Sequence, residues 1–169
     1  MKIIDNYLGI EDFKTIKRHI ESHTTFDWYL SPQANEWGTD ERAYQFMHNM
    51  VWAGKVKYEA VNLHLKILLR PLKKKLKVHR AKVNLFVNQS EPIKMGFHTD
   101  FDIPSMKTLL FYLQDSNGYT EFENGEKVES KENRALIFSS NIKHQTVSQT
   151  DTLFRTNINL NYEEIEWMN

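Results

Sequence analysis

The spacing of apolar residues changes once along this chain of 169 residues, at about residue 81. Before that point, apolar residues recur every three to four positions, as they do on one face of a helix. After it, they alternate with polar residues in short segments that are separated by turns, which is typical of half-buried strands. Helices followed by many short strands predict an α+β protein, mainly β, in which the helices pack against a sandwich or β-helix.

The N-terminal part has two segments with helical spacing. They predict helices over roughly residues 11–22 and 57–69, and Pro71 ends or kinks the second. Residues 31–56 contain proline and glycine at several points, so we expect them to be irregular. We therefore expect residues 1–80 to supply helical support and lid segments.

Strand signals dominate the rest of the chain. They cover residues 82–88, 107–113, 135–138 and 154–162. The pairs Asn117-Gly118 and Asn124-Gly125 are typical of hairpin turns between such strands. The length suits a single domain, so we expect one unit over the whole chain (1–169), with its catalytic β core over residues 81–169.

The composition excludes several classes of protein. The chain has no cysteine, which rules out a disulfide scaffold and a thiolate metal site. Its formal net charge is zero, so no overall attraction draws it to nucleic acid or to a membrane. No signal peptide and no membrane-spanning run is recognisable, so we expect a cytoplasmic protein without a membrane partner. No pattern specifies an oligomeric state.

Three residues have the chemistry of a metal site. His98 and Asp100 are two positions apart, so on a strand they point to the same side and can reach one ion. His144 follows a later apolar run that ends at Phe138. Two histidines and one carboxylate are the donor set of non-haem Fe(II), because they leave positions free for a chelating co-substrate and oxygen. Taken singly, each residue is also compatible with a surface loop or a structural histidine.

Arg155 starts a strand-like alternation in which Asn157, Asn159 and Asn161 share its face. Such a polar face is compatible with exposure to solvent. Arginine, however, is the side chain that binds a carboxylate with two parallel hydrogen bonds. A dicarboxylate that chelates iron through its keto-acid end needs such a contact at its far end.

Six ordered blocks resemble the Fe(II)/2-oxoglutarate dioxygenase superfamily, in its prolyl-4-hydroxylase-like branch, and are similar to short phage-encoded members. They are residues 80–85, 96–101, 108–113, 117–122 and 133–138, and His144 with Arg155. The resemblance covers most of the chain. It implies a double-stranded β-helix core of the jelly-roll or cupin type, with N-terminal helices packed against it.

The resemblance also implies cofactors and site residues. The cofactors are Fe(2+), the co-substrate 2-oxoglutarate and O2. The implied catalytic iron ligands are His98, Asp100 and His144. The implied contacts of 2-oxoglutarate are Arg155, Tyr112, Thr108 and Asn84. Tyr112 is also compatible with a core aromatic, Thr108 with a plain strand former, and Asn84 with a residue that caps an edge or binds water. Phe86 falls near a position that is commonly tyrosine, so that hydroxyl contact is lost.

The activity implied is that of an oxygenase that hydroxylates a substrate with release of succinate and CO2, or demethylates it where the hydroxylated carbon carries nitrogen. The neutral charge favours a peptide side chain or a small molecule over nucleic acid as substrate. One alternative is an AlkB-type nucleic-acid demethylase that uses the basic stretch 70–80, which is also explained as a solvated helix face. Another is a non-catalytic ligand-binding or structural β-helix module, which needs no iron.

Aromatic residues gather before the β core. They are Trp28, Tyr29, Trp37, Tyr44, Phe46 and Trp52. We expect most of them to form a hydrophobic layer between helices and sheet, the alternative being a lid or substrate wall at the mouth of the site.

Overall fold

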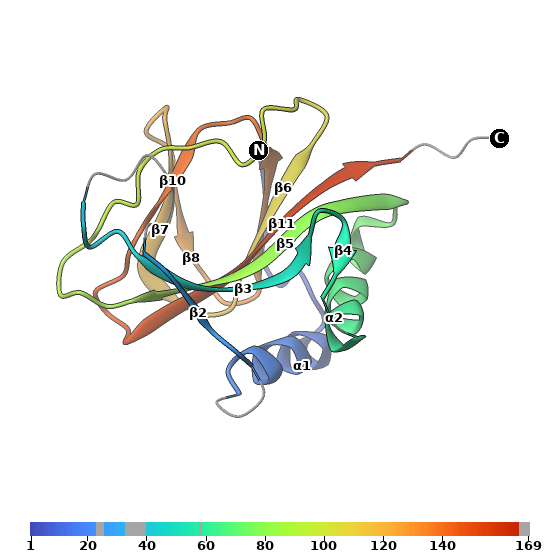
Figure 1. Ribbon diagram of the computed structural model, residues 1–169, viewed down its shortest axis with the longest axis horizontal. Helices are drawn as coiled ribbons and strands as arrows, with labels where there is room; N and C mark the ends of the chain where they lie inside the picture. The colour runs from blue at the N-terminus through green and yellow to red at the C-terminus, as the bar shows by residue number, and fades with distance from the viewer. Residues whose placement is uncertain (23–25, 33–39, 58, 166–169) are drawn as a thin grey trace.

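The computed structural model describes residues 1–22, 26–32, 40–57 and 59–165 (Figure 1). Two α-helices and a short 3-10 helix are found there: α1 (Ile10–Ile20), α2 (Glu59–Leu69) and η1 (Arg70–Leu72). The first strands are β1 (Lys2–Ile4), β2 (Tyr29–Ser31), β3 (Gln45–Trp52), β4 (Lys55–Val56) and β5 (Leu76–Val87). The later strands are β6 (Lys107–Tyr112), β7 (Ser116–Phe122), β8 (Lys127–Ser130), β9 (Arg134–Ser139), β10 (His144–Val147) and β11 (Phe154–Glu164).

The strands of the described residues form two antiparallel sheets. The larger has eight strands, in the order β1-β9-β6-β11-β5-β3-β2 with β4 paired to β3, and the smaller has the order β10-β7-β8. Isolated bridges join Lys94 to Val147 and His98 to His144, so the segment before β6 lies along β10. The mainly β architecture expected from the sequence is therefore confirmed.

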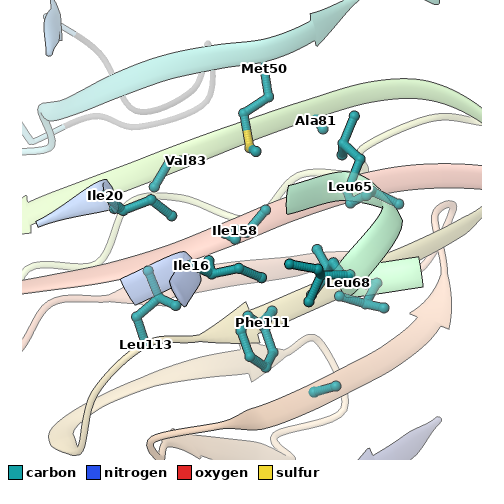
Figure 2. Packing of buried hydrophobic residues seen from close by; sticks show 14 of the residues in the cluster. Ile16, Ile20, Met50, Leu65, Leu68, Ala81, Val83, Phe111, Leu113 and Ile158 are labelled. Carbon is teal, nitrogen blue, oxygen red and sulfur yellow. The ribbon is translucent and has the colours of Figure 1, made fainter. Parts of the chain in front are cut away.

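Both helices cover one face of the larger sheet (Figure 1). Figure 2 shows their apolar side chains packed against those of β5, β6 and β11. The helical part of this core is formed by Phe13, Ile16, Ile20, Leu65 and Leu68, and the strand part includes Val83, Leu109, Phe111, Ile158 and Leu160. Burying such side chains removes apolar surface from water, which holds the helices to the sheet. Neither helix of the described chain is long and apolar enough to cross a membrane.

Residues 45–52, expected to be irregular, instead form β3, which pairs with β5 over five positions from Phe46↔Leu85 to Val51↔Ala81. His48 and Met50 are buried on one side of it, and the neighbouring strand supplies the hydrogen bonds. The pairing with β5 therefore outweighs the proline and glycine residues that predicted an irregular segment.

Two further expectations need correction. Asn117-Gly118 lies inside β7 and forms no turn, whereas Asn124-Gly125 does turn the chain, with Gly125 at a φ of +85°. The basic stretch 70–80 is not a single helix face, because only Arg70–Leu72 are helical, in η1, and β5 begins at Leu76. Its last residues therefore belong to the sheet.

The aromatic residues of the segment 28–52 do not form one layer. Tyr44 and Phe46 are partly buried and pack edge to face with each other, outside the helix-side core. Trp28 packs against Phe26 at the helix-side core, as expected. Tyr29 and Trp52 are more than half exposed, so the expected layer does not include them. Trp37 lies outside the described residues.

Candidate metal centre and anion pocket

The three expected metal ligands lie together at one end of the space between the two sheets. His98, Asp100 and His144 each offer one ligand atom, and these atoms all lie within 4.8 Å of one another. The backbone fixes them: the amide of His98 donates to the carbonyl of His144 at 2.9 Å, and the reverse bond is 3.0 Å. The amide of Asp100 donates to the carbonyl of Ser140 at 3.0 Å. The arrangement is therefore set by strand pairing and by the loop before β10.

Both histidines have the hydrogen bonding of a metal ligand. The Nδ1 atom of His98 lies 3.2 Å from the carbonyl oxygen of Gly96, and that of His144 lies 2.9 Å from the carbonyl oxygen of Ile142. A carbonyl only accepts, so Nδ1 carries the proton and Nε2 keeps a lone pair. Burial, with a smaller contribution from His144, lowers the pKa of His98 to about 4. His98 is therefore neutral at pH 7, as metal binding requires.

Polar side chains surround the carboxylate of Asp100. The Thr108 hydroxyl donates to it at 2.8 Å, Asn161 at 3.1 Å, and Asn159 reaches both oxygens at 3.2 and 3.3 Å. The guanidinium of Arg80 completes the set. Burial alone raises the pKa of Asp100, but the neighbouring histidines, Arg80 and the Thr108 hydrogen bond outweigh it and hold the pKa below its usual range. Asp100 is thus an oriented, ionised carboxylate.

Arg155 lies fully buried farther along the same face of β11. Its Nη2 donates to the carbonyl oxygen of Val147 at 3.2 Å, and its guanidinium lies 5.0 Å from the ring centre of Phe86. Its Nε and Nη1 have no hydrogen-bond partner among the described residues. Burial lowers the pKa of Arg155 to about 10, so it remains a cation at pH 7. Buried charges are costly without a partner, so this guanidinium is suited to receive an anion.

Gly118 leaves the room that Arg155 needs. A Cβ atom at position 118 would lie 2.7 Å from Nε of Arg155 and 3.1 Å from Cβ of Gln149. Position 118 is therefore glycine because of a close approach inside the sheet, and not because of a turn. Tyr112 lies close enough to influence Arg155 electrostatically, and its hydroxyl is 2.8 Å from that of Thr120.

One cavity runs from the two histidine ligands to Phe86, whose ring packs on the guanidinium of Arg155. Its lining includes His98, His144, Asn84, Phe86, Asn157 and Asn159. Asn84 donates to Asn157 at 2.9 Å, while its own Oδ1 has no partner in the described part of the chain. The cavity holds about 30 Å³, roughly one water molecule, so a dicarboxylate enters only if lining side chains rotate away.

The residues predicted from the sequence thus lie near one another, but Thr108 lies at the metal end and not at the end of Arg155. Asn84 lines the cavity, and Tyr112 lies beside Arg155. Thr108 is directed at Asp100 and at Ser140, so it lies at the metal end, away from Arg155. The polar face of β11 is buried, which removes exposure to solvent as its explanation.

Sequence reasoning missed several polar residues of the site. Arg80 was assigned to the basic stretch and Lys82 to an unremarkable strand, yet both share the inner face of β5 with Asn84. Side chains alternate between the two faces of a strand, so Lys82 and Arg80, two and four positions before Asn84, are expected to share its face. No signal in a single sequence identifies Gly118, because its constraint comes from a residue 37 positions away.

No family model matches the sequence, and no curated protein matches it either. Solved structures do match the fold. One is an oxidoreductase of the 2OG-Fe(II) oxygenase family from Burkholderia pseudomallei, with a TM-score of 0.68, 9% identity, and coverage of 95% of this chain and 84% of that one. Another is a Trichoplax adhaerens prolyl hydroxylase in complex with a peptide fragment of the hypoxia inducible factor oxygen degradation domain, with a TM-score of 0.65, 15% identity, and coverage of 96% and 83%.

A third is HygX from Streptomyces hygroscopicus with nickel and 2-oxoglutarate bound, with a TM-score of 0.60, 12% identity, and coverage of 98% and 83%. Identities this low are evidence of shared fold only. The expected fold class is thereby confirmed: the chain has the double-stranded β-helix fold of 2OG-Fe(II) oxygenase family proteins, prolyl hydroxylases among them.

Proposed function

We propose that this protein is an Fe(II)- and 2-oxoglutarate-dependent oxygenase that hydroxylates a peptide side chain or a small molecule. The observation that carries the proposal is the presence, on one inner face of the sheets, of a two-histidine, one-carboxylate cluster and a buried arginine with two unpaired donors. The two histidines and Phe86, which packs on that arginine, line the same cavity. A donor set of this kind suits Fe(II), and the arginine suits the far carboxylate of a dicarboxylate. The fold shared with known oxygenases supports the same reading.

At the metal end, His98 and His144 would supply their Nε2 atoms and Asp100 one carboxylate oxygen. Thr108, Asn159 and Asn161 hold that carboxylate in place. With 2-oxoglutarate and O2, bound iron supplies the oxidation of an unactivated C–H bond while 2-oxoglutarate is converted to succinate and CO2. If the hydroxylated carbon is a methyl group bound to nitrogen, the carbon–nitrogen bond then breaks, and the outcome is demethylation.

At the far end, Arg155 would bind the distal carboxylate of 2-oxoglutarate through Nε and Nη1, the donors that lack partners. Tyr112 lies beside it, and Phe86 covers the guanidinium and keeps water away. Asn84 and Asn157 line the path between the two ends. These side chains would position the co-substrate, and their burial strengthens each ionic contact.

No observation favours a nucleic-acid substrate. In the basic stretch 70–80, Arg70 pairs with Asp12, Lys74 with Glu164 and Arg80 with Asp100. Three of the six Lys and Arg side chains of this stretch are therefore paired within the protein, which weakens the phosphate attraction that such an enzyme needs. A salt-dependent DNA-binding titration tests this alternative directly.

An anaerobic titration tests the proposal. Fe(II) and then 2-oxoglutarate are added to the purified protein, and the weak visible charge-transfer band of the chelate is recorded for wild type, His98→Ala and Arg155→Ala. We expect a band in wild type, no band in His98→Ala, and a band in Arg155→Ala only at much higher 2-oxoglutarate. A folded wild-type protein that retains no iron and develops no band contradicts the proposal and favours a non-catalytic module.

A further inference from the structure

Lys82 is a charged residue of the cavity to which the proposed reaction gives no role. It lies on β5, between Asn49 of β3 and Asn159 of β11, and its side chain lines the same cavity as His98 and His144. Its ammonium group makes no ion pair or hydrogen bond with any residue that the structure describes. An unpaired cation beside a metal centre therefore requires an explanation.

The surroundings of Lys82 make its positive charge energetically unfavourable. Burial, with a contribution from Arg80, lowers the pKa of Lys82 to about 8, while Asp100 acts in the opposite direction. Its accessible surface faces the cavity, so a ligand there can reach it. Asp100 is a poor partner for it, because Arg80 and three neutral donors already occupy that carboxylate. An anion from outside the chain would relieve the cost.

A count of charges around the cavity points in the same direction. Three cations, Arg80, Lys82 and Arg155, lie on the inner faces of the strands around the cavity, together with one carboxylate, Asp100. A doubly charged metal ion and doubly charged 2-oxoglutarate would cancel each other, which leaves the surplus of two positive charges unchanged. Asp151 also acts on Arg155, but it is exposed at the surface. The loaded site would still favour a negatively charged molecule.

Building on the proposed oxygenase function, we propose that the substrate to be oxidised carries an anionic group, a carboxylate or a phosphate, that pairs with Lys82 at the metal end of the cavity. Space for the rest of the molecule exists next to Asp100, in a hollow of about 340 Å³. Trp52 and Phe101 line this hollow, and so does Arg80, which is two positions from Lys82 on the same strand face and pairs with Asp100. The proposed substrate class is thus a small or terminal anion attached to an apolar or aromatic body.

The competing explanation is that Lys82 serves 2-oxoglutarate itself. The distal carboxylate has a better site at Arg155, where two buried donors lack partners. The keto-acid end would be held by the metal. Affinity for 2-oxoglutarate therefore separates the two explanations, because only the competing one makes it depend on Lys82.

The test uses benzoate and phenyl phosphate as anionic probes and benzamide as the neutral probe of matched shape. Protein loaded with Zn(II), which supports no turnover, and 2-oxoglutarate is titrated with each probe by ligand-observed NMR. The variants are Lys82→Met, Lys82→Arg, and Lys82→Gln as a second neutral variant should Lys82→Met fail to fold. The affinity of each for 2-oxoglutarate is measured separately from the anaerobic Fe(II) chelate band.

We expect wild type and Lys82→Arg to bind at least one anionic probe about tenfold more tightly than benzamide, as a charge-assisted contact allows. The neutral variants should lose that preference while keeping 2-oxoglutarate affinity within about twofold. Equal binding of anionic and neutral probes by wild type overturns the inference, and so does a preference that survives in the neutral variants. A loss of 2-oxoglutarate affinity comparable to that of Arg155→Ala assigns Lys82 to the co-substrate instead.

The two proposals fail separately. If wild type forms no iron chelate, the oxygenase function is contradicted, and the anion titration is then repeated on protein without metal or 2-oxoglutarate. A preference for the anionic probes that depends on Lys82 in that titration supports an anion site, and its absence overturns the inference.

Discussion

The two faces of β11 are equally buried but differ in chemistry. Ile158, Leu160 and Tyr162 point to the helices and join an apolar core. Arg155, Asn157, Asn159 and Asn161 point between the sheets and are equally buried, at 4% exposure or less. One strand thus buries apolar and polar residues to the same extent on opposite sides. Burial of the apolar side stabilises the fold, whereas burial of the polar side costs free energy unless partners or ligands satisfy it.

This difference suggests a division of labour within one sheet. The helix side, with its close-packed apolar residues, is expected to set the free energy of unfolding. Among the described residues, the inner side contains unpaired polar atoms on Arg155, Asn84 and Asn159, whereas those of the helices are on His19 and His64. Function is therefore expected to depend on the inner side and stability on the outer side, and the following substitutions test that separation.

Replacing Arg155 by methionine should have the largest effect on ligand binding. It keeps the length of the side chain but removes every donor aimed at the anion pocket, so we expect the dissociation constant for 2-oxoglutarate to rise at least about 100-fold. Arg70→Met is the matched control, because Arg70 is exposed and pairs with Asp12 on the helix side. A titration of the anaerobic chelate band measures both. Equal affinities for the two variants would show that Arg155 does not hold the co-substrate.

Replacing Ile158 by alanine should act on the opposite face only. Ile158 is fully buried in the helix-side core, so we expect about 2–4 kcal/mol of lost stability from the cavity that is left. Urea unfolding measures this loss. Provided that the variant is folded, its affinity for 2-oxoglutarate should stay within about twofold of wild type, since Ile158 points away from the site. A large change in affinity would mean that the two faces are coupled.

Lowering the pH should reduce the free energy of unfolding through His64, a buried residue of α2. Burial, together with the nearby His19, lowers the pKa of His64 to about 4. The unfolded chain therefore takes up the proton first as the pH falls, so stability is lost between about pH 6.5 and pH 4. We expect the free energy of unfolding to fall by about 2 kcal/mol from pH 7 to pH 5 on account of this residue. His64→Phe should show a correspondingly smaller fall, and an identical fall in both proteins would exclude His64 as the cause.

Replacing Thr108 by valine tests the support around Asp100 and should give the smallest of these effects. The substitution keeps the shape of the side chain and removes the 2.8 Å hydrogen bond to the carboxylate, so we expect about a tenfold loss of Fe(II) affinity. Thr156→Val is the control, because its hydroxyl faces Gln114 on the same sheet. Competition with a metal chelator measures both variants. The prediction is wrong if both lose the same affinity.

The two faces also show how far the sequence alone could lead. Helix positions and the strands around Thr108–Leu113 and Phe154–Tyr162 follow from apolar spacing, because the outer face of the sheet is patterned by burial. The strand at residues 45–52 does not, because its pairing with β5 is a long-range interaction. Local patterns contain no information about such partners.

The same limit applies to the site. His98, Asp100 and His144 could be grouped because their residue types form a recognisable donor set, and the structure brings them together. Arg80 and Lys82 were missed, because their charges look like those of a solvated surface; the alternation backward from Asn84 places them on its face, but only the fold shows that this face is enclosed. Gly118 was misread as a turn, because only the position of Arg155 reveals the constraint on it.

The central claim is that the inner face is built around one metal ion and one dicarboxylate. The most direct test is a crystal structure, determined without oxygen, of the protein with Mn(II) and 2-oxoglutarate, in which anomalous scattering locates the metal. The account predicts a single anomalous peak bound by His98, Asp100 and His144, with 2-oxoglutarate extending from it to the guanidinium of Arg155. A metal bound elsewhere, or a dicarboxylate that does not reach Arg155, would contradict it.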